Sequence, residues 1–446
     1  MASSNYNHDQ VKAAGLFERF WGKIVRFGLM LKKLGQDDPR RIVHSFKVAL
    51  ALTLVSVLFY FEPLFEGFGI AAMWAILSVV VVFEFSVGAT LGRGFNRMLA
   101  TIVAAALGIG AHRLATLSGN QGEPVLIALF VFVEAGIVTF FRFIPQMKAR
   151  YNYGLLIFNL TFCLVSVSGY RDDEVIRMAF ERVGTIIIGS CIAVAVCVLI
   201  RPVWIGVELH NQIATNMEKL ANFLEGFGDE YFKLNENGQT RDQSLSLQGY
   251  KSVLTSKGSE DTMANLARWE PRHGWFSFRH PWNQYLKVGN LTRHCAIKIE
   301  ALNSYLTSET QAPPEVKSII QGPSMIISSE CGKALKELAT SMKKMIKSSS
   351  YEPHIANSKE AAEELKVVIR SSLCKHSADS LHIIQEGAVA SLLFQIITCT
   401  EDIAEAAHKL ASQAHFKDVK PRVTPDQENS VNDGPHHVIT IADTAT

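Results

Sequence analysis

Four cations stand inside or at the edge of long apolar stretches: Lys47, Arg93, Arg97 and Arg182. A charge at membrane depth is costly unless it faces water or a partner, so such residues are candidates for function. Anion pores use Arg and Lys to replace the water around the ion, and a guanidinium group matches a carboxylate in a bidentate way. The chemistry that these residues indicate is the binding and passage of anions.

Arg93 and Arg97 also have a simpler interpretation, because cations anchor the cytosolic ends of membrane spans. Arg97 is expected to start the third apolar run, with Arg93 one turn before it on the same face. Arg182 is expected to open the sixth run near its outer side, where anchoring does not require a cation. Glu84 and Glu134 are candidate counter-ions for Arg182, or partners of other polar groups.

No catalytic or metal-binding constellation accompanies these cations. The seven cysteines are scattered without a CxxC pair, so neither a zinc site nor a disulfide framework is predicted. The glycine-rich run 88–94 (GATLGRG) lacks the lysine and serine of a phosphate loop, and its glycines fit a tight turn or a close helix approach. We expect no enzyme activity and no cofactor. The net charge of +2, without a basic stripe, indicates no nucleic-acid partner.

The elements that must position the cations are six apolar runs joined by short loops. A helix needs ~20 residues to cross the hydrocarbon of a bilayer, and polar residues at the ends of the shorter runs would then enter the interface. A soluble all-α protein is the alternative, but an uncharged run such as 151–170 disfavours it. We predict a six-helix transmembrane domain over residues 42–200, with spans at 42–61, 67–83, 98–111, 124–141, 151–170 and 183–200.

The distribution of Lys and Arg predicts the orientation of these spans. With the N-terminus in the cytosol, the cytosolic loops carry five Lys and Arg residues and the outer loops carry two. Both termini should therefore be cytosolic, and the outer loops are acidic. The cytosolic loops are 84–97 and 142–150; the outer loops are 62–66, 112–123 and 170–175.

Composition changes sharply near residue 201, which predicts a domain boundary there. Residues 201–415 carry apolar residues at helical spacing and predict an all-α cytosolic domain, whereas the aperiodic polar segment 416–446 is predicted to be a disordered tail. Residues 1–41 form a cytosolic N-terminal segment. Its basic amphipathic stretch 13–31 fits a helix on the membrane surface or a packed soluble helix.

Aromatic residues are concentrated in the segment 268–282 (RWEPRHGWFSFRHPW). A ligand site is one interpretation of this segment. We favour an aromatic plug that packs the cytosolic domain against the base of the membrane domain, since aromatic side chains are usually buried in a core.

Six motifs stand out along residues 37–410: DPRR at 38–41, AMWA at 72–75, VVVVFEFSVGATLG at 79–92, RFIP at 142–145, KARYNYG at 148–154 and WEP at 269–271. Together they resemble the plant aluminium-activated malate transporter family. The resemblance implies a passive, voltage-sensitive anion channel that carries malate and inorganic anions such as chloride and nitrate. It also implies a homodimer with a basic conduction path, and it places the pore arginines at Arg97 and Arg182.

The resemblance further implies that outer carboxylates can bind the activating aluminium ion. Glu66 and Asp173 fit these positions, with Glu62 and Asp172 beside them. Arg177 stands one turn beyond Asp173, where another carboxylate would help, so repulsion predicts weak or absent activation by aluminium. Alternatively, Arg177 pairs with a neighbouring carboxylate and faces away from the ion.

A proton-coupled exporter of aromatic or other organic acids is the alternative function. It would need a titratable residue that cycles within the membrane, and Glu84 and Glu134 are the candidates. A membrane-bound enzyme is disfavoured, since no nucleophile–base pair is recognisable. We expect the chain to lie among membrane lipids, in the plasma membrane rather than in the vacuolar membrane.

Overall fold

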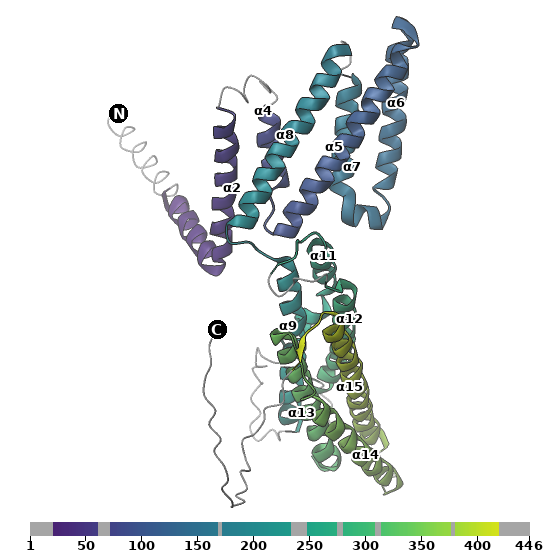
Figure 1. Cartoon of the computed structure of the whole chain (residues 1–446). Helices are drawn as coiled ribbons and strands as arrows, with labels where there is room; N and C mark the ends of the chain where they lie inside the picture. Colours follow the sequence, from purple (N-terminus) through teal and green to yellow (C-terminus); the bar gives the residue numbers. More distant parts are fainter. Residues whose placement is uncertain are drawn as a thin grey trace, which may run out of the picture.

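The computed structural model describes residues 21–60, 72–167, 172–232, 248–273, 280–307, 314–375 and 380–418. The chain forms two helical halves that stand one above the other (Figure 1). The upper half contains the helices of the apolar runs, and the lower half begins at residue 205. This arrangement confirms the predicted all-α fold class.

The upper half contains one helix for each predicted span. Three of these helices, α2, α6 and α7, are close to the predicted lengths, α5 and α8 are longer, and α4 covers 11 residues after the undescribed segment 61–71. Their bounds are α2 (Pro39–Leu58), α4 (Ala72–Val82), α5 (Val87–Thr116), α6 (Gly119–Phe141), α7 (Pro145–Val167) and α8 (Asp172–Leu199).

Helix α5 begins earlier than predicted. Ser86 caps its first turn, with the side-chain oxygen accepting a hydrogen bond from the Ala89 N–H at 3.3 Å. The predicted cytosolic loop 84–97 was therefore too long, since only residues 83–86 separate α4 from α5. Arg93 and Arg97 consequently lie on the helix itself. The apolar run marked only the middle of α5, because its first turns are rich in glycine and polar residues.

Length and composition alone identify a different set of candidate spans. Within the described residues, five helical segments are long and apolar enough to cross a membrane. Four coincide with predicted spans, but the fifth, Glu386–Gln413, has half of its most apolar window buried inside the lower half. Helix α7 is not among them, and its first turns carry Lys148 and Arg150. Apolar length by itself therefore does not distinguish a span from a core helix here.

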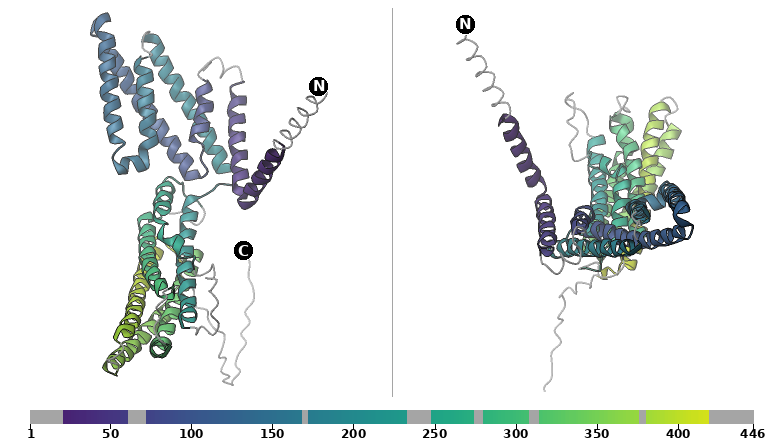
Figure 2. Two further views of the ribbon diagram at one scale, coloured as in Figure 1. Left: turned by 180° about the vertical axis from the view of Figure 1, so that it is seen from behind. Right: turned by 90° about the horizontal axis from the view of Figure 1, so that it is seen from above.

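Residues 21–37 form a helix that projects away from the upper half (Figure 2). Its apolar side chains are exposed, among them Trp21, Phe27 and Met30 at 58–63% of their full area. Packing against the core of the same chain, one of the two alternatives for this segment, is therefore not observed. A position on the membrane surface remains the prediction.

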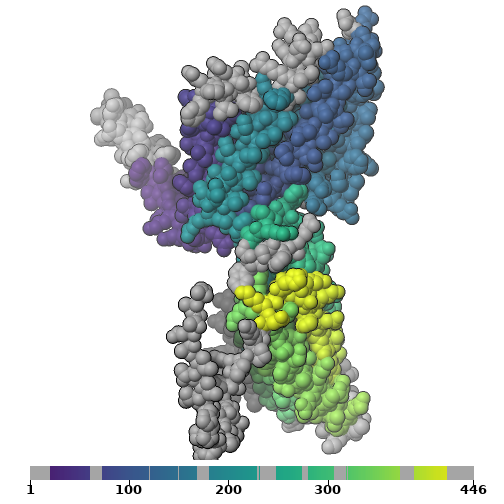
Figure 3. All heavy atoms as spheres, in the orientation of Figure 1, coloured from purple at the N-terminus to yellow at the C-terminus, as the bar shows by residue number. Residues whose placement is uncertain are grey.

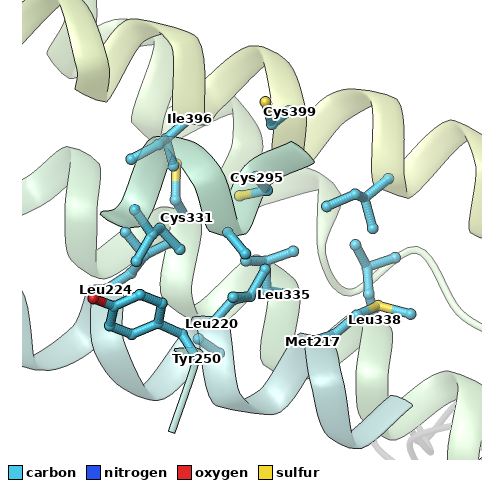
Figure 4. Packing of buried hydrophobic residues seen from close by; sticks show 14 of the residues in the cluster. Met217, Leu220, Leu224, Tyr250, Cys295, Cys331, Leu335, Leu338, Ile396 and Cys399 are labelled. Atoms are coloured by element: carbon cyan, nitrogen blue, oxygen red, sulfur yellow. The ribbon is translucent and has the colours of Figure 1, made fainter. Parts of the chain in front are cut away.

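The lower half is a helical bundle with one extensive core. Figure 4 shows Met217, Leu220 and Leu224 of α9 lying near Leu335 and Leu338 of α13. Its helices are α9 (Ile205–Phe232), α10 (Lys251–Leu254), α11 (Lys257–Ala267), α12 (Trp282–Thr307), α13 (Pro314–Lys344), α14 (Glu352–Lys375) and α15 (Ser380–Gln413). The core also contains free cysteines: Cys295, Cys331 and Cys399.

The predicted disordered tail starts too early. Residues Ile346–Lys347 form strand β1, which pairs in parallel with β2 (Lys417–Asp418). Phe416 is buried and clusters with Met345 and Ala411. Burial of the large apolar side chain of Phe416 stabilises this end of the chain. The ordered fold therefore extends to residue 418. Residues 419–446 lie outside the described part of the chain.

The two halves are joined by a short connection after α8. Arg201 adopts a left-handed backbone conformation with φ of 39°, and Pro202 follows it, so the helix cannot continue. Lys47 of α2 donates a hydrogen bond from Nζ to the Arg201 carbonyl oxygen at 2.9 Å. The lower half then approaches the upper half at α11, as the space-filling view shows (Figure 3).

The contact between α11 and α5 depends on a glycine. A Cβ atom at Gly88 would stand 2.4 Å from the backbone carbonyl oxygen of Leu266, which no side chain tolerates. At Gly92, a Cβ atom would lie only 3.1 Å from the Trp269 ring. This confirms that the glycine-rich run serves a close approach.

Candidate anion site

Arg97 lies deep inside the upper half. It is ten residues from the start of α5, which corresponds to about 15 Å along the helix axis. Its side chain is 3% exposed, and its NH1 group donates a hydrogen bond to the Tyr153 hydroxyl oxygen at 2.8 Å. Arg97 is thus not at the edge of the span, as the sequence indicated, but well within it.

Arg182 is placed in a corresponding way on α8. It lies ten residues after Asp172, so this arginine also lies within its span and not at the opening of it. The side chain is 5% exposed, and its guanidinium carbon stands 4.1 Å from the centroid of the Trp74 ring on α4. This distance is typical of a cation–π interaction.

The structure brings Arg97 and Arg182 together. They lie close enough for their positive charges to repel each other. Among the described residues, no carboxylate forms an ion pair with either arginine, and the Nε atoms of both are buried without a hydrogen-bond partner. The partners that hold them, a phenol and an indole, carry no charge. Both cations therefore remain available to an anion.

Hydroxyl groups are buried in the same set of helices. In the part of the chain that the structure describes, the side-chain oxygens of Thr101, Thr161 and Ser190 are buried and have no hydrogen-bond partner. Thr101 lies one turn from Arg97 on α5, and Ser190 of α8 lies beside Gly94 of α5. Buried polar atoms are rarely left unsatisfied, so water or a passing anion is the natural partner for these groups.

Arg93 and Glu84 form an ion pair with each other. Glu84 is thus not the counter-ion of Arg182. The Arg93 guanidinium also lies 5.9 Å from the centroid of the Tyr153 ring, whose hydroxyl binds Arg97. Arg93 is half exposed, unlike the two buried arginines, and it lies one turn before Arg97 on α5.

Lys47 and Glu134 lie apart from this pair of arginines. Lys47 is 2% exposed, and its bond to the Arg201 carbonyl ties α2 to the end of α8. The structure does not bring it to Arg97 or Arg182. Among the described residues, neither carboxylate oxygen of Glu134 has a hydrogen-bond partner, so it is not paired with Arg182.

The predicted aluminium-binding carboxylates are only partly covered by the structure. Glu62 and Glu66 lie outside the described residues. Asp172 and Asp173 form the beginning of α8, so residue 177 is on the helix, about one turn beyond Asp173.

The WEP segment connects the site to the lower half. The Trp269 ring lies 5.5 Å from that of Phe95 on α5 and 5.3 Å from the Arg150 guanidinium on α7. Glu270 caps α9 by accepting hydrogen bonds from the Ile205 and Gly206 N–H groups at 2.6 and 3.1 Å. Trp269 thus plays the predicted role of an aromatic plug at the membrane base, while residues 274–279 lie outside the described part.

Sequence reasoning found the two arginines but missed the residues that hold them. Trp74 and Tyr153 stood within the family motifs, yet nothing in their spacing connected them to Arg182 and Arg97. An aromatic residue inside an apolar helix has many possible neighbours. One property of such a residue could have indicated its role. The hydroxyl of a tyrosine or the ring face of a tryptophan can bind a cation without neutralising its charge.

Fold and site together define a multi-pass helical membrane protein with buried cations suited to anions. The chain belongs to the aluminium-activated malate transporter family, whose sequence model matches residues 32–378. It is 48% identical over 429 residues to aluminum-activated malate transporter 2 of Arabidopsis thaliana, covering 94% of this chain and 85% of the relative. Aluminum-activated malate transporter 1 of Triticum aestivum is 43% identical, over 91% of this chain and 88% of the relative. The predicted family is thereby confirmed.

Proposed function

We propose that this chain is an anion channel that passes malate, and inorganic anions such as chloride and nitrate, passively across a plant membrane. The observation that carries the proposal is the pair Arg97 and Arg182, both buried, and neither paired with a carboxylate among the described residues. Malate as the substrate is supported by the relatives, which are named as malate transporters.

The surroundings of the arginines suit conduction better than tight binding. Two buried positive charges are unfavourable unless an anion or water compensates them. The neutral Tyr153 and Trp74 hold the cations in place without removing their charge. A conducting site must attract the ion and also release it, and an anion that binds between the two cations reduces their mutual repulsion more than water does.

A homodimer in the plasma membrane completes the proposal. Viewed from above, the upper half of one chain forms a narrow band (Figure 2). A second copy would supply an opposing wall that carries the same arginines. Because closed two-fold dimers are the commonest assemblies of identical chains, a dimer is the simplest arrangement.

Patch-clamp recording of the full chain, with malate, chloride and nitrate in turn, tests this function. We expect Arg97→Ala and Arg182→Ala each to reduce the anion current by about tenfold or more at equal surface expression, because each removes a charge that stabilises the passing ion. Arg113→Ala is the matched control, since Arg113 is an exposed arginine near the other end of α5. Normal currents in both pore variants would contradict the proposal.

Proton-coupled export of organic acids is the second candidate, and Glu134 is the observation that favours it. Its carboxylate lies at membrane depth without a hydrogen-bond partner among the described residues. If a proton is coupled to transport, the reversal potential should shift with pH, and Glu134→Gln should abolish that shift. A reversal potential that follows the anion gradient alone favours the channel.

A further inference from the structure

A cavity of about 950 Å³ lies where the lower half meets the base of the upper half. Four separate parts of the chain form its wall: the first turns of α7, the segment after α11, the beginning of α12 and the end of α15. Five cations line it, and they are Arg150, Arg268, Arg272, Lys287 and Lys409.

These cations are not neutralised by the protein. Within the described residues, none of the five forms an ion pair with a carboxylate. The carboxylate that lines the cavity, Glu270, is bound to the N–H groups of Ile205 and Gly206. A surface with solvated cations usually mixes both signs of charge. Five cations that converge on one hollow concentrate a positive potential there, which attracts anions.

The side chains around the cavity suit phosphate groups. Guanidinium groups bind phosphate oxygens in a bidentate way, and lysines bind them as point charges. The neutral side chains of Asn283 and Gln284 also line the cavity. Asn283 accepts a hydrogen bond from Arg268 at 2.7 Å, and Gln284 donates one to the Ala406 carbonyl oxygen at 2.9 Å. The volume is far larger than a dicarboxylate needs, so the five charges indicate a ligand with several phosphate groups.

The cavity is also close to the expected surface of the bilayer. Arg150 belongs to the second turn of α7, just after the cytosolic turn that joins α6 to α7, and Arg142 and Lys148 flank it. Basic residues in this position attract anionic lipid headgroups. A ligand could therefore enter from the inner leaflet as well as from the cytosol.

We propose that this cavity binds a multiply phosphorylated inositol group, carried by a polyphosphoinositide lipid of the inner leaflet or present as the free inositol phosphate. The five cations hold its phosphate groups, and Asn283 and Gln284 contact the remaining oxygens. The site is distinct from Arg97 and Arg182, which lie inside the upper half.

A ligand in this cavity would act on α5 through Arg150. The Arg150 carbonyl oxygen accepts a hydrogen bond from the Asn96 side chain at 3.1 Å, and Asn96 precedes Arg97. The Arg150 guanidinium lies over the Trp269 ring, which in turn contacts Phe95 and Gly92. Binding of a ligand to Arg150 would therefore shift the first turns of α5, which carry Asn96 and Arg97. This regulatory step rests on the proposed channel function, whereas binding itself does not.

Binding is measured on the purified full chain in lipid nanodiscs, with free inositol 1,4,5-trisphosphate as one probe and dioctanoyl phosphatidylinositol 4,5-bisphosphate as the other. We expect Lys287→Ala combined with Lys409→Ala to weaken binding by about tenfold or more, since two charge-assisted contacts are lost. Lys257→Ala combined with Lys344→Ala removes the same charge from exposed positions outside the cavity and should leave binding unchanged.

The two probes distinguish the source of the ligand. Binding of both supports recognition of the phosphorylated ring alone, and binding of the lipid probe only supports a site that includes the bilayer. The proposal is overturned if neither probe binds, if the control variant loses as much affinity as the cavity variant, or if malate displaces the probe at equal concentration.

Currents then test the regulatory step separately. In excised patches, the lipid probe applied to the cytosolic side should change the wild-type anion current, while the Lys287→Ala, Lys409→Ala variant should conduct without responding. If the wild type binds the probe but carries no anion current, the proposed channel function is contradicted and the proposed binding site is still supported. A variant that responds like the wild type would overturn the regulatory role.

Discussion

Two buried arginines in this family member are held by neutral aromatic residues, which preserves their charge. The Tyr153 hydroxyl accepts from Arg97, and the Trp74 ring lies against Arg182. A carboxylate at either position would neutralise the cation and compete with a passing anion. Lys47 is a buried cation with a structural role. Its hydrogen bond to the Arg201 carbonyl oxygen ties α2 to the end of α8.

At the scale of a single residue, Arg177 is expected to decide how strongly aluminium activates the protein. Because α8 begins at Asp172, residue 177 lies about one turn beyond Asp173. Its positive charge would weaken the binding of a trivalent cation to the outer carboxylates, although water at the surface screens part of this repulsion. We expect weak activation of the wild type by aluminium and a larger response in Arg177→Asp.

Whole-cell anion currents before and after addition of aluminium check this expectation. Arg113→Asp is a suitable control, since it makes the same charge change at another residue near the outer side. Strong activation of the wild type that Arg177→Asp leaves unaltered would show that Arg177 faces away from the ion.

At the scale of elements, the packing of α8 on α4 depends on Gly189. A Cβ atom there would stand 2.5 Å from the Ala75 carbonyl oxygen, which belongs to the backbone and cannot rotate away. Gly189→Ala should therefore separate the two helices and lower stability by about 1–3 kcal/mol, as overpacking does. The displaced helices carry Trp74 and Arg182, so the anion current should decrease too.

Thermal unfolding of the purified protein measures this change. Gly136→Ala on α6 is the matched control, because a Cβ atom at that position meets nothing within 4 Å. We expect the control to match or slightly exceed the wild type, since alanine favours the helix more than glycine does. Equal melting temperatures of the two variants would contradict the close contact of α4 with α8.

The N-terminal cap of α9 makes stability depend on pH. Burial raises the pKa of Glu270 from 4.5 to about 7, against the opposing effect of its hydrogen bonds to the Ile205 and Gly206 N–H groups. Between pH 4.5 and 7 the folded chain then binds a proton that the unfolded chain has released. Stability from this group is therefore present at low pH and lost as the pH rises towards 7.

The melting temperature of Glu270→Gln, compared with the wild type at pH 5 and pH 7.5, tests the cap. Glutamine is neutral at both pH values. The melting temperature of the variant should therefore decrease less between pH 5 and pH 7.5 than that of the wild type. Glu363→Gln changes an exposed carboxylate on α14 and should keep the wild-type dependence. Identical pH dependence in Glu270→Gln and the wild type would refute the shifted pKa.

At the scale of the whole molecule, the cations near the ends of the spans predict the orientation in the membrane. Arg93 and Arg97 belong to α5 and no longer count as loop residues. The bias nevertheless persists, because the rule includes residues near the helix ends. Arg40 lies in the first turn of α2 and pairs with Glu208 of α9, Arg142 directly follows α6, and Arg201 lies in the connection from α8 to α9.

Epitope tags at residues 2 and 446 test this orientation. Both tags should be inaccessible to antibody in intact cells and should become accessible after permeabilisation, because the lower half is expected in the cytosol. A tag in the outer loop after α5, next to Leu117, provides the control that must be labelled in intact cells. Labelling of either terminal tag in intact cells would contradict the prediction that both termini are cytosolic.

Most of the helices and the candidate site residues could be predicted from the amino-acid sequence. Apolar runs and helical spacing depend on the chain alone, so the helices of the upper half and the long helices of the lower half were recognisable, whereas α10 and α11 were not. Their ends were less certain, because the first turns of α5 and α8 are polar and resemble loops. A cation inside an apolar run is visible without a structure, which is why Arg97 and Arg182 were found.

The contacts between side chains from different helices could not be predicted from the sequence. The pairing of Arg93 with Glu84, the bond from Lys47 to Arg201, and the contacts of Tyr153 and Trp74 with the arginines all join different segments. The basic cavity is the clearest case, since Arg150 of α7 and Lys409 of α15 are far apart in the sequence and line the same hollow. Such contacts arise from how the helices pack, and packing depends on shape complementarity between side chains far apart in the sequence.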